Sequence, residues 1–280
     1  MEPVTAARWN TVVRFALGTA IALLMVLPFV WMLTTAVRER GTVPPRTLQL
    51  LPDSFTLANF REVFHVLPFG TMALNSIIVA SIAVPASVLV ASWAGFTLLF
   101  LSSQLRSWLV GIVFVAAMIP TTAFWVTRFV LFGWINVIDS WWPLILPALT
   151  GMSPLFALVF LWSYRGIPME MFEAARLDGA GPFRIWATIA VPLTLPTTVA
   201  VAMLVFRIVW NDFVDPLIYI QSMSKQTLPF ALSALYQFAP TDWPLLMAAT
   251  VILTTPVVAL FLMGQRAFTN VHRGAGWLGN

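Results

Sequence analysis

Apolar residues gather into six blocks, and polar segments separate them. The blocks run from about Phe15 to Val37, Thr71 to Leu99, Ser107 to Ile135, Trp141 to Ser163, Ile185 to Trp210 and Trp243 to Gly264. Each is long enough to cross a hydrocarbon core, which takes about 20 apolar residues in a helix. An open strand would leave its backbone groups unsatisfied in lipid. We therefore predict an all-α integral membrane protein, a single domain over residues 1–280 with six transmembrane helices.

Prolines lie inside or at the edges of these predicted spans. They are Pro28, Pro85, Pro120, Pro147, Pro192, Pro196 and Pro256. Because proline lacks an N–H group and its ring crowds the preceding helical turn, these positions predict kinked helices. Kinked helices suit a transporter that opens alternately, but they also occur in membrane proteins that only hold a shape. The prolines alone leave both alternatives open.

Composition narrows the possible chemistry. Hydrophobic residues make up 60% of the chain and charged residues only 9%. The sequence has no cysteine, which excludes disulfides and thiolate chemistry. Its two histidines, His65 and His272, are too far apart to suggest a zinc or haem site. Lys225 is the only lysine, so the net charge of +4 rests on arginine, and in a membrane chain it reflects topology. We expect no metal, no cofactor and no nucleic-acid partner for this chain.

The arginines predict the orientation. In a six-span arrangement one side carries Arg8, Arg106, Arg165, Arg176, Arg184, Arg266 and Arg273 together with both termini. Basic residues favour the cytoplasmic side, so this side is predicted to be cytoplasmic. The segment from Arg38 to Gly70 must then lie outside, although it carries Arg38, Arg40, Arg46 and Arg61. It is long and proline-rich, and the bias weakens away from the ends of spans.

A charged patch, "GIPMEMFEAARLDGAG", lies between the fourth and fifth spans, in the predicted cytoplasmic loop 164–184. Pro168 suits the first position of a helix, and the helix dipole favours Glu170 and Glu173 in the first two turns. The glycines of "DGAG" end the helix. The pattern predicts a short rigid helix that projects from the bilayer. A capped helix lying at the headgroups is the alternative, but such helices normally carry basic residues, so the acidic ones favour a protein partner.

The sequence after this helix carries a resemblance. "EAARLDGAGPFRIWATIAVPLTLP" resembles the EAA loop of the permease subunits of bacterial ABC importers. The positions that match that pattern are Glu173, Ala174, Ala175, Gly179, Ile189 and Pro192, with Val191 in place of the usual leucine. Four further stretches, "LNSIIVA" at 74–80, "MIPTT" at 118–122, "WNDFVDPLIY" at 210–219 and "LMAATVILTTPVVALFLMGQRAF" at 246–268, are similar to carbohydrate-importer permeases related to the second maltose-permease subunit. The resemblance covers nearly the whole chain.

This resemblance implies the transmembrane permease subunit of an ATP-driven sugar importer in a bacterial inner membrane. The implied partners are a second homologous permease in a heterodimer, two ATPase subunits that hold ATP and Mg, and an extracytoplasmic substrate-binding protein. The sequence lacks G-x-x-x-x-G-K-[ST], so this chain has no P-loop and is not expected to be an enzyme. The resemblance assigns ATPase contacts to Glu170, Glu173, Ala174, Ala175, Arg176, Asp178 and Gly179, with Arg176 and Arg184 as salt-bridging or lipid-facing candidates.

Polar and aromatic residues in or beside the spans are the candidates for the substrate pathway. They are Asn75, Trp125, Trp210, Asn211 and Asp212. Polar groups in lipid are costly unless they serve packing or transport. For Asn75 and Asn211 an interhelical hydrogen bond is an equal alternative. The sequence does not choose between a disaccharide, an amino sugar and a glycerol-phosphate-like polyol.

Arg207 lies about one turn inside the end of the fifth predicted span. Its expected partner is Asp212 or an acidic group of the neighbouring permease, and the alternative is a side chain that reaches the membrane interface. The polar group around it, Asn211, Asp212 and Asp215 included, keeps a self-contained secondary transporter or channel as the rival function. The lack of an inverted repeat in the sequence weakens that rival.

Overall fold

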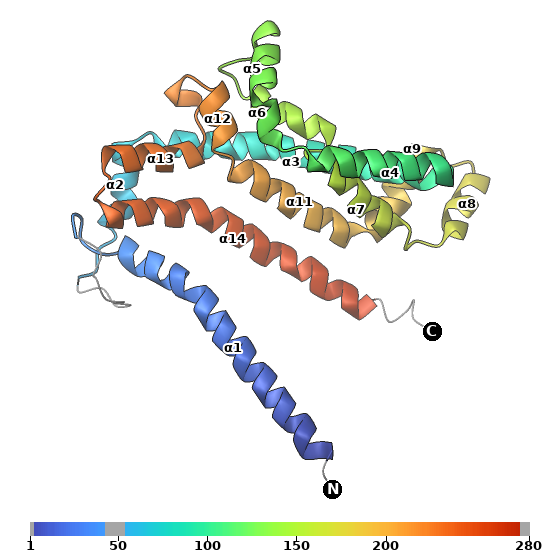
Figure 1. Cartoon of the computed structure of the whole chain (residues 1–280), viewed down its shortest axis with the longest axis horizontal. Coiled ribbons are helices and arrows are strands. Elements are labelled where there is room, and N and C mark those ends of the chain that lie inside the picture. The colour runs from blue at the N-terminus through green and yellow to red at the C-terminus, as the bar shows by residue number, and fades with distance from the viewer. Residues whose placement is uncertain (1–2, 43–53, 275–280) are drawn as a thin grey trace. The chain divides into compact units, whose positions relative to one another are not determined.

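The computed structural model describes residues 3–42 and 54–274, and the side chains of residues 12–42 and 54–265. Every regular element in this described part is a helix (Figure 1). Arg46 lies in the segment 43–53, outside the described residues. Contacts within the chain form two compact units, residues 1–67 with 232–254 and residues 68–231 with 255–280, and each is described by itself.

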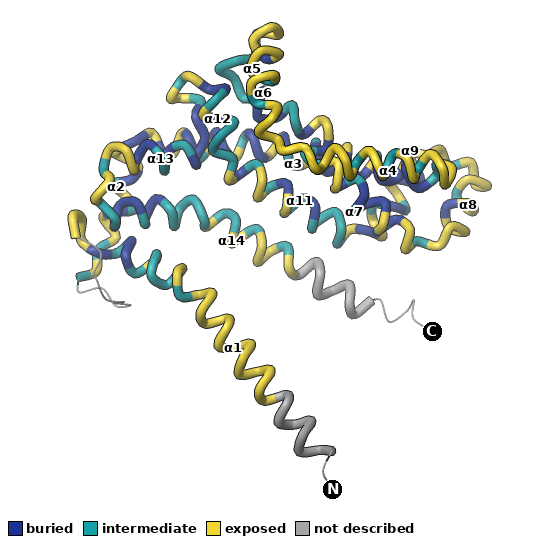
Figure 2. Tube along the Cα trace, in the orientation of Figure 1, coloured by how far each residue is buried: buried dark blue, intermediate teal, exposed yellow. Residues whose placement is uncertain are grey.

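The first unit contains α1 (Pro3–Ala36), α2 (Ala58–Val66), the end of α13 (Leu228–Phe238) and the start of α14 (Trp243–Gly274). Within α1, the stretch Val12–Ala36 is long and apolar enough to cross a membrane, and its most apolar part has no buried residue. Figure 2 shows most of the described part of α1 as exposed. A helix so apolar and so exposed requires lipid or another protein around it.

Polar contacts hold the C-terminal end of α1 in this unit. The Asn59 side chain of α2 donates to the carbonyl oxygens of Ala36 (2.8 Å) and Arg38 (2.7 Å). The Arg40 guanidinium donates to Glu62 Oε1 and to Asp242 Oδ2, both at 2.8 Å. Arg38 itself is buried, with 7% of its surface exposed. Arg38 and Arg40 therefore have structural roles, which explains their presence in a segment predicted to lie outside.

The second unit holds most of the helices. In chain order they are α3 (Phe69–Phe100), α4 (Ser103–Met118), η1 (Thr121–Phe124), α5 (Trp125–Trp134), α6 (Trp142–Ile145), η2 (Leu146–Thr150), α7 (Pro154–Tyr164), α8 (Met169–Leu177), α9 (Pro182–Ile185), the π-helical η3 (Trp186–Ala190), α10 (Val191–Leu193), α11 (Leu195–Trp210), α12 (Val214–Tyr219) and η4 (Met223–Lys225). The first residues of α13 and the C-terminal part of α14 complete it.

The core of the second unit forms where α3 packs against α7 and α11 (Figures 1 and 2). Gly95 lets α3 and α7 approach closely, because a Cβ atom there would lie 2.6 Å from the Ala157 carbonyl oxygen. A buried polar chain crosses the same core. The Trp186 indole donates to Ser92 Oγ (2.9 Å), and Ser92 Oγ shares a hydrogen bond with the Tyr164 hydroxyl (2.6 Å). These contacts join α3, α7 and the π-helical turn.

Four helical stretches are long and apolar enough to cross a membrane, namely Val12–Ala36, Phe69–Phe100, Trp142–Tyr164 and Trp243–Gln265. Two pairs of helices are long and apolar enough only when each pair is taken together, and each pair is sharply bent at its break. They are Ser103–Met118 with Thr121–Trp134, bent by 83°, and Pro182–Leu193 with Leu195–Trp210, bent by 85°. The described residues thus hold four candidate spans, or up to six if each bent pair is one span.

Proline and glycine explain where the helices break. Ile119 is extended because the following Pro120 disfavours the helical conformation in the residue before it, and this ends α4. The second break lies at Thr194, two residues before Pro196. Gly151, at φ +80°, ends η2 before α7 begins. In contrast, Pro28, Pro85 and Pro256 lie inside continuous helices.

Candidate functional site

The short helix predicted within residues 164–184 forms as α8, and one of its faces is fixed to the end of α3. Phe172 is fully buried, and its ring makes edge contacts with those of Phe96 and Phe100, with centroids 6.0 Å and 5.7 Å apart. The Arg176 guanidinium lies over the Phe100 ring, 4.4 Å from its centroid. Two aromatic side chains of α3 therefore hold α8, and Arg176, expected to contact an ATPase, also packs against its own chain.

The C-terminal end of α8 has the hydrogen bonds of a Schellman motif. The Ala180 N–H donates to the Ala175 carbonyl (3.0 Å), and the Gly179 N–H donates to the Arg176 carbonyl (3.0 Å). Gly179 lies at φ +79°, the left-handed conformation that this motif requires after a helix. A Cβ atom at Gly179 would meet nothing within 4 Å, so any cost of a side chain there comes from the backbone conformation.

The opposite face of α8 is open. Glu170, Glu173, Ala174, Asp178 and Gly179 are exposed, whereas Ala175 is half-buried against the core. Met169 and Met171 are exposed to about two fifths, and Leu177 to 89%. The face exposes two methionines and a leucine beside its acidic groups, and methionine is enriched at protein interfaces.

A cavity of about 390 Å³ lies elsewhere in the second unit. Residues of α3, the break between α4 and η1, α5, η2, α7, α11 and α12 line it. Its charged lining residues are Arg128 and Asp212 with Asp215, and Trp125, Ser76 and Thr227 add polar groups. Its volume is in the range of small-ligand pockets.

The charged residues of the cavity come from two places in the chain, α5 and the junction between α11 and α12. Arg128 and Trp125 are on α5, and they line the cavity together with Asp215 of α12. Asp212 follows α11, and its Oδ1 accepts from the Asp215 N–H (3.2 Å), which orients the start of α12. Tyr219 of α12 donates its hydroxyl to the Trp125 carbonyl (3.3 Å). These bonds fasten α5 to the corner between α11 and α12.

The predicted pathway residues divide into two groups. Trp125 and Asp212 line the cavity. Asn75 instead donates to the carbonyls of Ser224 (2.8 Å) and Gln226 (2.9 Å), which is the packing role left open for it. Trp210 is buried against the Phe206 ring, and the exposed Asn211 side chain donates to the Arg207 carbonyl (2.9 Å).

Arg207 is exposed, and among the described residues it forms no ion pair with Asp212. Asp212 instead lies in the electrostatic field of Arg128, as Asp215 does. Sequence reasoning missed Arg128, although it is the one charged residue well inside the third predicted span, and an ionisable residue in a span is a signal of function. Thr227 had no such signal in the sequence.

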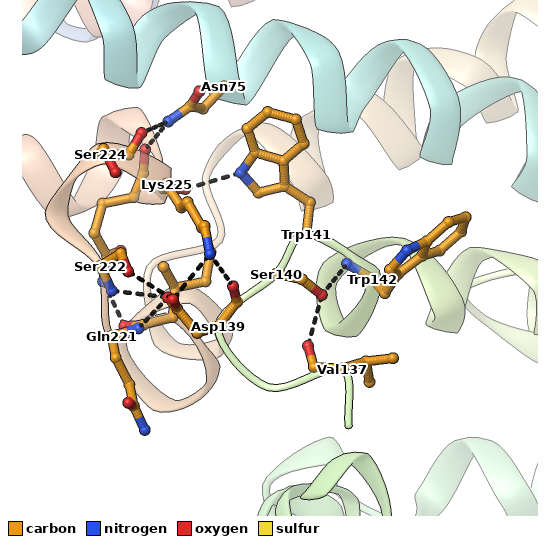
Figure 3. Close-up of polar contacts among 12 residues, drawn as sticks. Asn75, Val137, Asp139, Ser140, Trp141, Trp142, Gln221, Ser222, Ser224 and Lys225 are labelled. Atoms are coloured by element: carbon orange, nitrogen blue, oxygen red, sulfur yellow. Dashed lines mark hydrogen bonds and ion pairs between the residues drawn. The ribbon is translucent and has the colours of Figure 1, made fainter. Parts of the chain in front are cut away.

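A cluster of hydrogen bonds holds the segment 220–228 beside the cavity (Figure 3). Asp139 accepts from the backbone N–H groups of Gln221 (3.0 Å) and Ser222 (2.8 Å), from Ser222 Oγ (2.6 Å) and from Lys225 Nζ (2.9 Å). Lys225 Nζ also donates to the Asp139 carbonyl (2.6 Å), and the Trp141 indole donates to the Lys225 carbonyl (3.0 Å). We call Asp139, Ser222 and Lys225 the clasp.

The clasp has an electrostatic consequence. The Ser222 hydroxyl, the Ser222 N–H and Lys225 together hold the pKa of the Asp139 carboxyl well below its usual range. On α3, Ser76 Oγ accepts from the Leu228 N–H (2.8 Å), while Asn75 holds Ser224 and Gln226. The backbone is therefore fixed on both sides of Thr227.

Among the described residues, no group of three or more His, Asp or Glu side chains could hold a metal ion.

A family model, described as "Binding-protein-dependent transport system inner membrane component", matches residues 83–274. The chain belongs to this family. Its members are transport permeases, so the chain is a multi-pass inner-membrane permease. The matched region includes α8 and nearly all of the cavity lining.

Individual relatives agree with the family. The chain is 27% identical over 263 residues to the trehalose transport system permease protein of Mycobacterium tuberculosis, covering 93% of both chains. It is 26% identical over 254 residues to the sulfoquinovosyl glycerol transport system permease protein of Agrobacterium fabrum, covering 90% of this chain and 88% of the relative. The fold resembles a chain of a bacterial ABC transporter that imports the acidic polysaccharide alginate, with a TM-score of 0.75, 18% identity and coverage of 94% and 98%.

Proposed function

We propose that this permease is one half of the translocation pathway of an ATP-driven importer for a sugar or sugar-like solute, and that α8 docks on a separate ATPase subunit. The observation that carries the proposal is the way α8 packs: the buried Phe172 holds one face against the rest of the chain, while the acidic face is exposed. The chain also belongs to a family of transport permeases. The relatives named for trehalose and for sulfoquinovosyl glycerol support a carbohydrate as the solute.

The contacts of α8 suit the transmission of force. A push on its exposed face acts through Phe172 on the end of α3, and through the Gly179 turn on α9 and the π-helical turn. The chain from Trp186 through Ser92 to Tyr164 links the same turn to α3 and α7. Closure of an ATPase dimer on ATP can thus move several candidate spans together, because packed cores shift as units.

We propose the following arrangement in the membrane. Each bent pair is one span, so the spans number six, and α8 lies between the fourth and fifth on the cytoplasmic side, with both termini. The partners are a second homologous permease, two ATPase subunits that hold ATP and Mg, and an extracytoplasmic binding protein. On α8, Glu170, Glu173, Ala174, Ala175 and Asp178 form the ATPase contact, and Gly179 permits the turn.

The test compares charge and backbone variants of α8. Glu173→Lys reverses a charge on the exposed face, and Gly179→Val places a β-branched side chain at φ +79°, which costs about 1–2 kcal/mol or more. We expect both variants to insert in the membrane but to lose co-purification of the ATPase subunit, or substrate-stimulated hydrolysis in reconstituted vesicles. Gly181→Val is the matched control, because Gly181 has φ −72° and open space around it.

Two results would contradict the proposal. If Glu173→Lys and Gly179→Val retain the ATPase subunit and normal stimulation, then α8 is only a capped surface helix. If the permease moves solute across vesicles without any ATPase subunit, the rival function of a self-contained transporter is correct.

A further inference from the structure

Thr227 is a buried polar group that points to a ligand in the cavity. Only 5% of its surface is exposed, it lines the cavity, and its Oγ1 has no hydrogen-bond partner among the described residues. A buried hydroxyl without a partner costs about 1–3 kcal/mol. The bonds from Asn75 and Ser76 fix the backbone on both sides of Thr227, so this segment cannot shift to bring the hydroxyl to another partner. A bound polar molecule would supply the missing partner.

Arg128 is the second such group. It lines the cavity, is half-buried and takes part in no ion pair between described residues. A guanidinium has five N–H donors and no acceptor, whereas the carboxylates of Asp212 and Asp215 only accept. Donors and acceptors therefore face the same space of about 390 Å³.

This combination matches a hydroxyl-rich, uncharged ligand. Each sugar hydroxyl can donate to a carboxylate and accept from a guanidinium or from Thr227. The lining holds two carboxylates and one guanidinium, so its formal charge is negative. A phosphate, sulfonate or carboxylate on the ligand can only accept, and it would add a further negative charge where solvent screens it weakly.

We propose that this cavity binds the transported solute as an uncharged sugar and disfavours sugars with anionic groups, and that Arg128, Asp212, Asp215 and Thr227 determine this specificity. The inference rests on the proposed function and adds the charge class of the solute. The relatives do not decide this class, because one is named for trehalose, which is neutral, and one for a sulfonated glycoside.

The test uses the complete transporter, with both permeases and its ATPase subunits, in nanodiscs without a binding protein. Saturation-transfer NMR would compare trehalose with trehalose 6-phosphate as probes. We expect transfer to trehalose and at least fivefold weaker transfer to its phosphate. Thr227→Val, which keeps the side-chain shape, should weaken trehalose binding by about fivefold or more. Thr97→Val is the matched control, because Thr97 is exposed on α3 and outside the cavity lining.

The charges are tested by a second variant. Replacing both Asp212 and Asp215 by asparagine makes the formal charge of the lining positive, and it should reduce or reverse the preference for trehalose over its phosphate. The inference fails if the wild type binds the phosphate as well as trehalose, if it binds neither probe, or if Thr227→Val binds trehalose normally. Failure of the proposed function shows separately, as a wild-type permease that does not retain the ATPase subunit.

Discussion

Replacing Gly95 by alanine should destabilise the packing between α3 and α7. The new Cβ atom would lie 2.6 Å from the Ala157 carbonyl oxygen, 2.7 Å from Phe160 Cβ and 2.9 Å from the Leu161 nitrogen. Two of these atoms are backbone atoms of α7, and the third is held next to the backbone. No rotation of a flexible side chain can relieve the contact, so the two helices must separate.

The expected magnitude follows from these distances. An ordinary contact begins near 3.4 Å, so α3 and α7 must move apart by about 0.8 Å at this point. Overpacking of a close-packed core costs about 1–3 kcal/mol. Alanine also favours a helix over glycine by about 1 kcal/mol, which offsets part of this cost. We therefore expect a net loss of stability of up to about 2 kcal/mol.

Thermal unfolding of the purified complex, followed by size-exclusion chromatography after heating, measures this effect. Gly111→Ala is the control, because Gly111 lies inside α4 and a Cβ atom added there would meet nothing within 4 Å. It should leave the melting temperature unchanged or raise it. A melting temperature for Gly95→Ala equal to or above that of Gly111→Ala would refute the close approach of α3 and α7.

Three further predictions concern α8, the clasp and the first unit. Phe172→Ala removes the buried aromatic ring that holds α8 against α3, at a cost of about 3–5 kcal/mol in stability. The variant should lose co-purification of the ATPase subunit in a pull-down, while membrane fractionation should show that it still inserts. Asp139→Asn should increase hydrogen exchange of residues 220–228 at neutral pH. In the wild type, folding lowers the pKa of Asp139. The stabilisation from its ionised carboxylate is therefore complete above the unfolded pKa near 4, and it is lost only as the pH falls below that value. Loss of protection of residues 220–228 already near pH 6 would contradict the clasp. Arg40→Gln removes the ion pairs with Glu62 and Asp242 and should increase proteolysis near α2, whereas Arg61→Gln should not.

Hydropathy was sufficient to predict most of the apolar helices. The stretches that begin near Phe15, Thr71 and Trp243 correspond to helices of the structure, because a continuous apolar run in helical conformation satisfies its own backbone. Hydropathy could not predict the sharp bends at residues 119–120 and 194–195. The prolines there indicated kinks, but Pro28 and Pro85 look the same in sequence and lie in unbroken helices. The presence of a proline alone therefore does not show where a helix ends.

The candidate site was predictable only in part, for a related reason. The charges and glycines of α8 are local signals, so its bounds and its Gly179 turn followed from the sequence. The residue that seats α8, Phe172, was not singled out, because its partners Phe96 and Phe100 lie more than seventy positions away. Asn75 and Asp212 were equally plausible polar residues, and only the fold shows that one bonds to backbone carbonyls while the other lines the cavity.

The clasp also makes this chain convenient for chemical labelling. Lys225 is its only lysine and the chain has no cysteine, so an amine-reactive dye finds a single side-chain target, without any prior mutagenesis. While the clasp is closed, the Lys225 amine donates to two oxygens of Asp139 and is a poor nucleophile, although nearly half of the side chain is exposed. The rate of acylation at this one position therefore reports how often the clasp opens, and a fluorophore placed there would follow the segment 220–228 through the transport cycle.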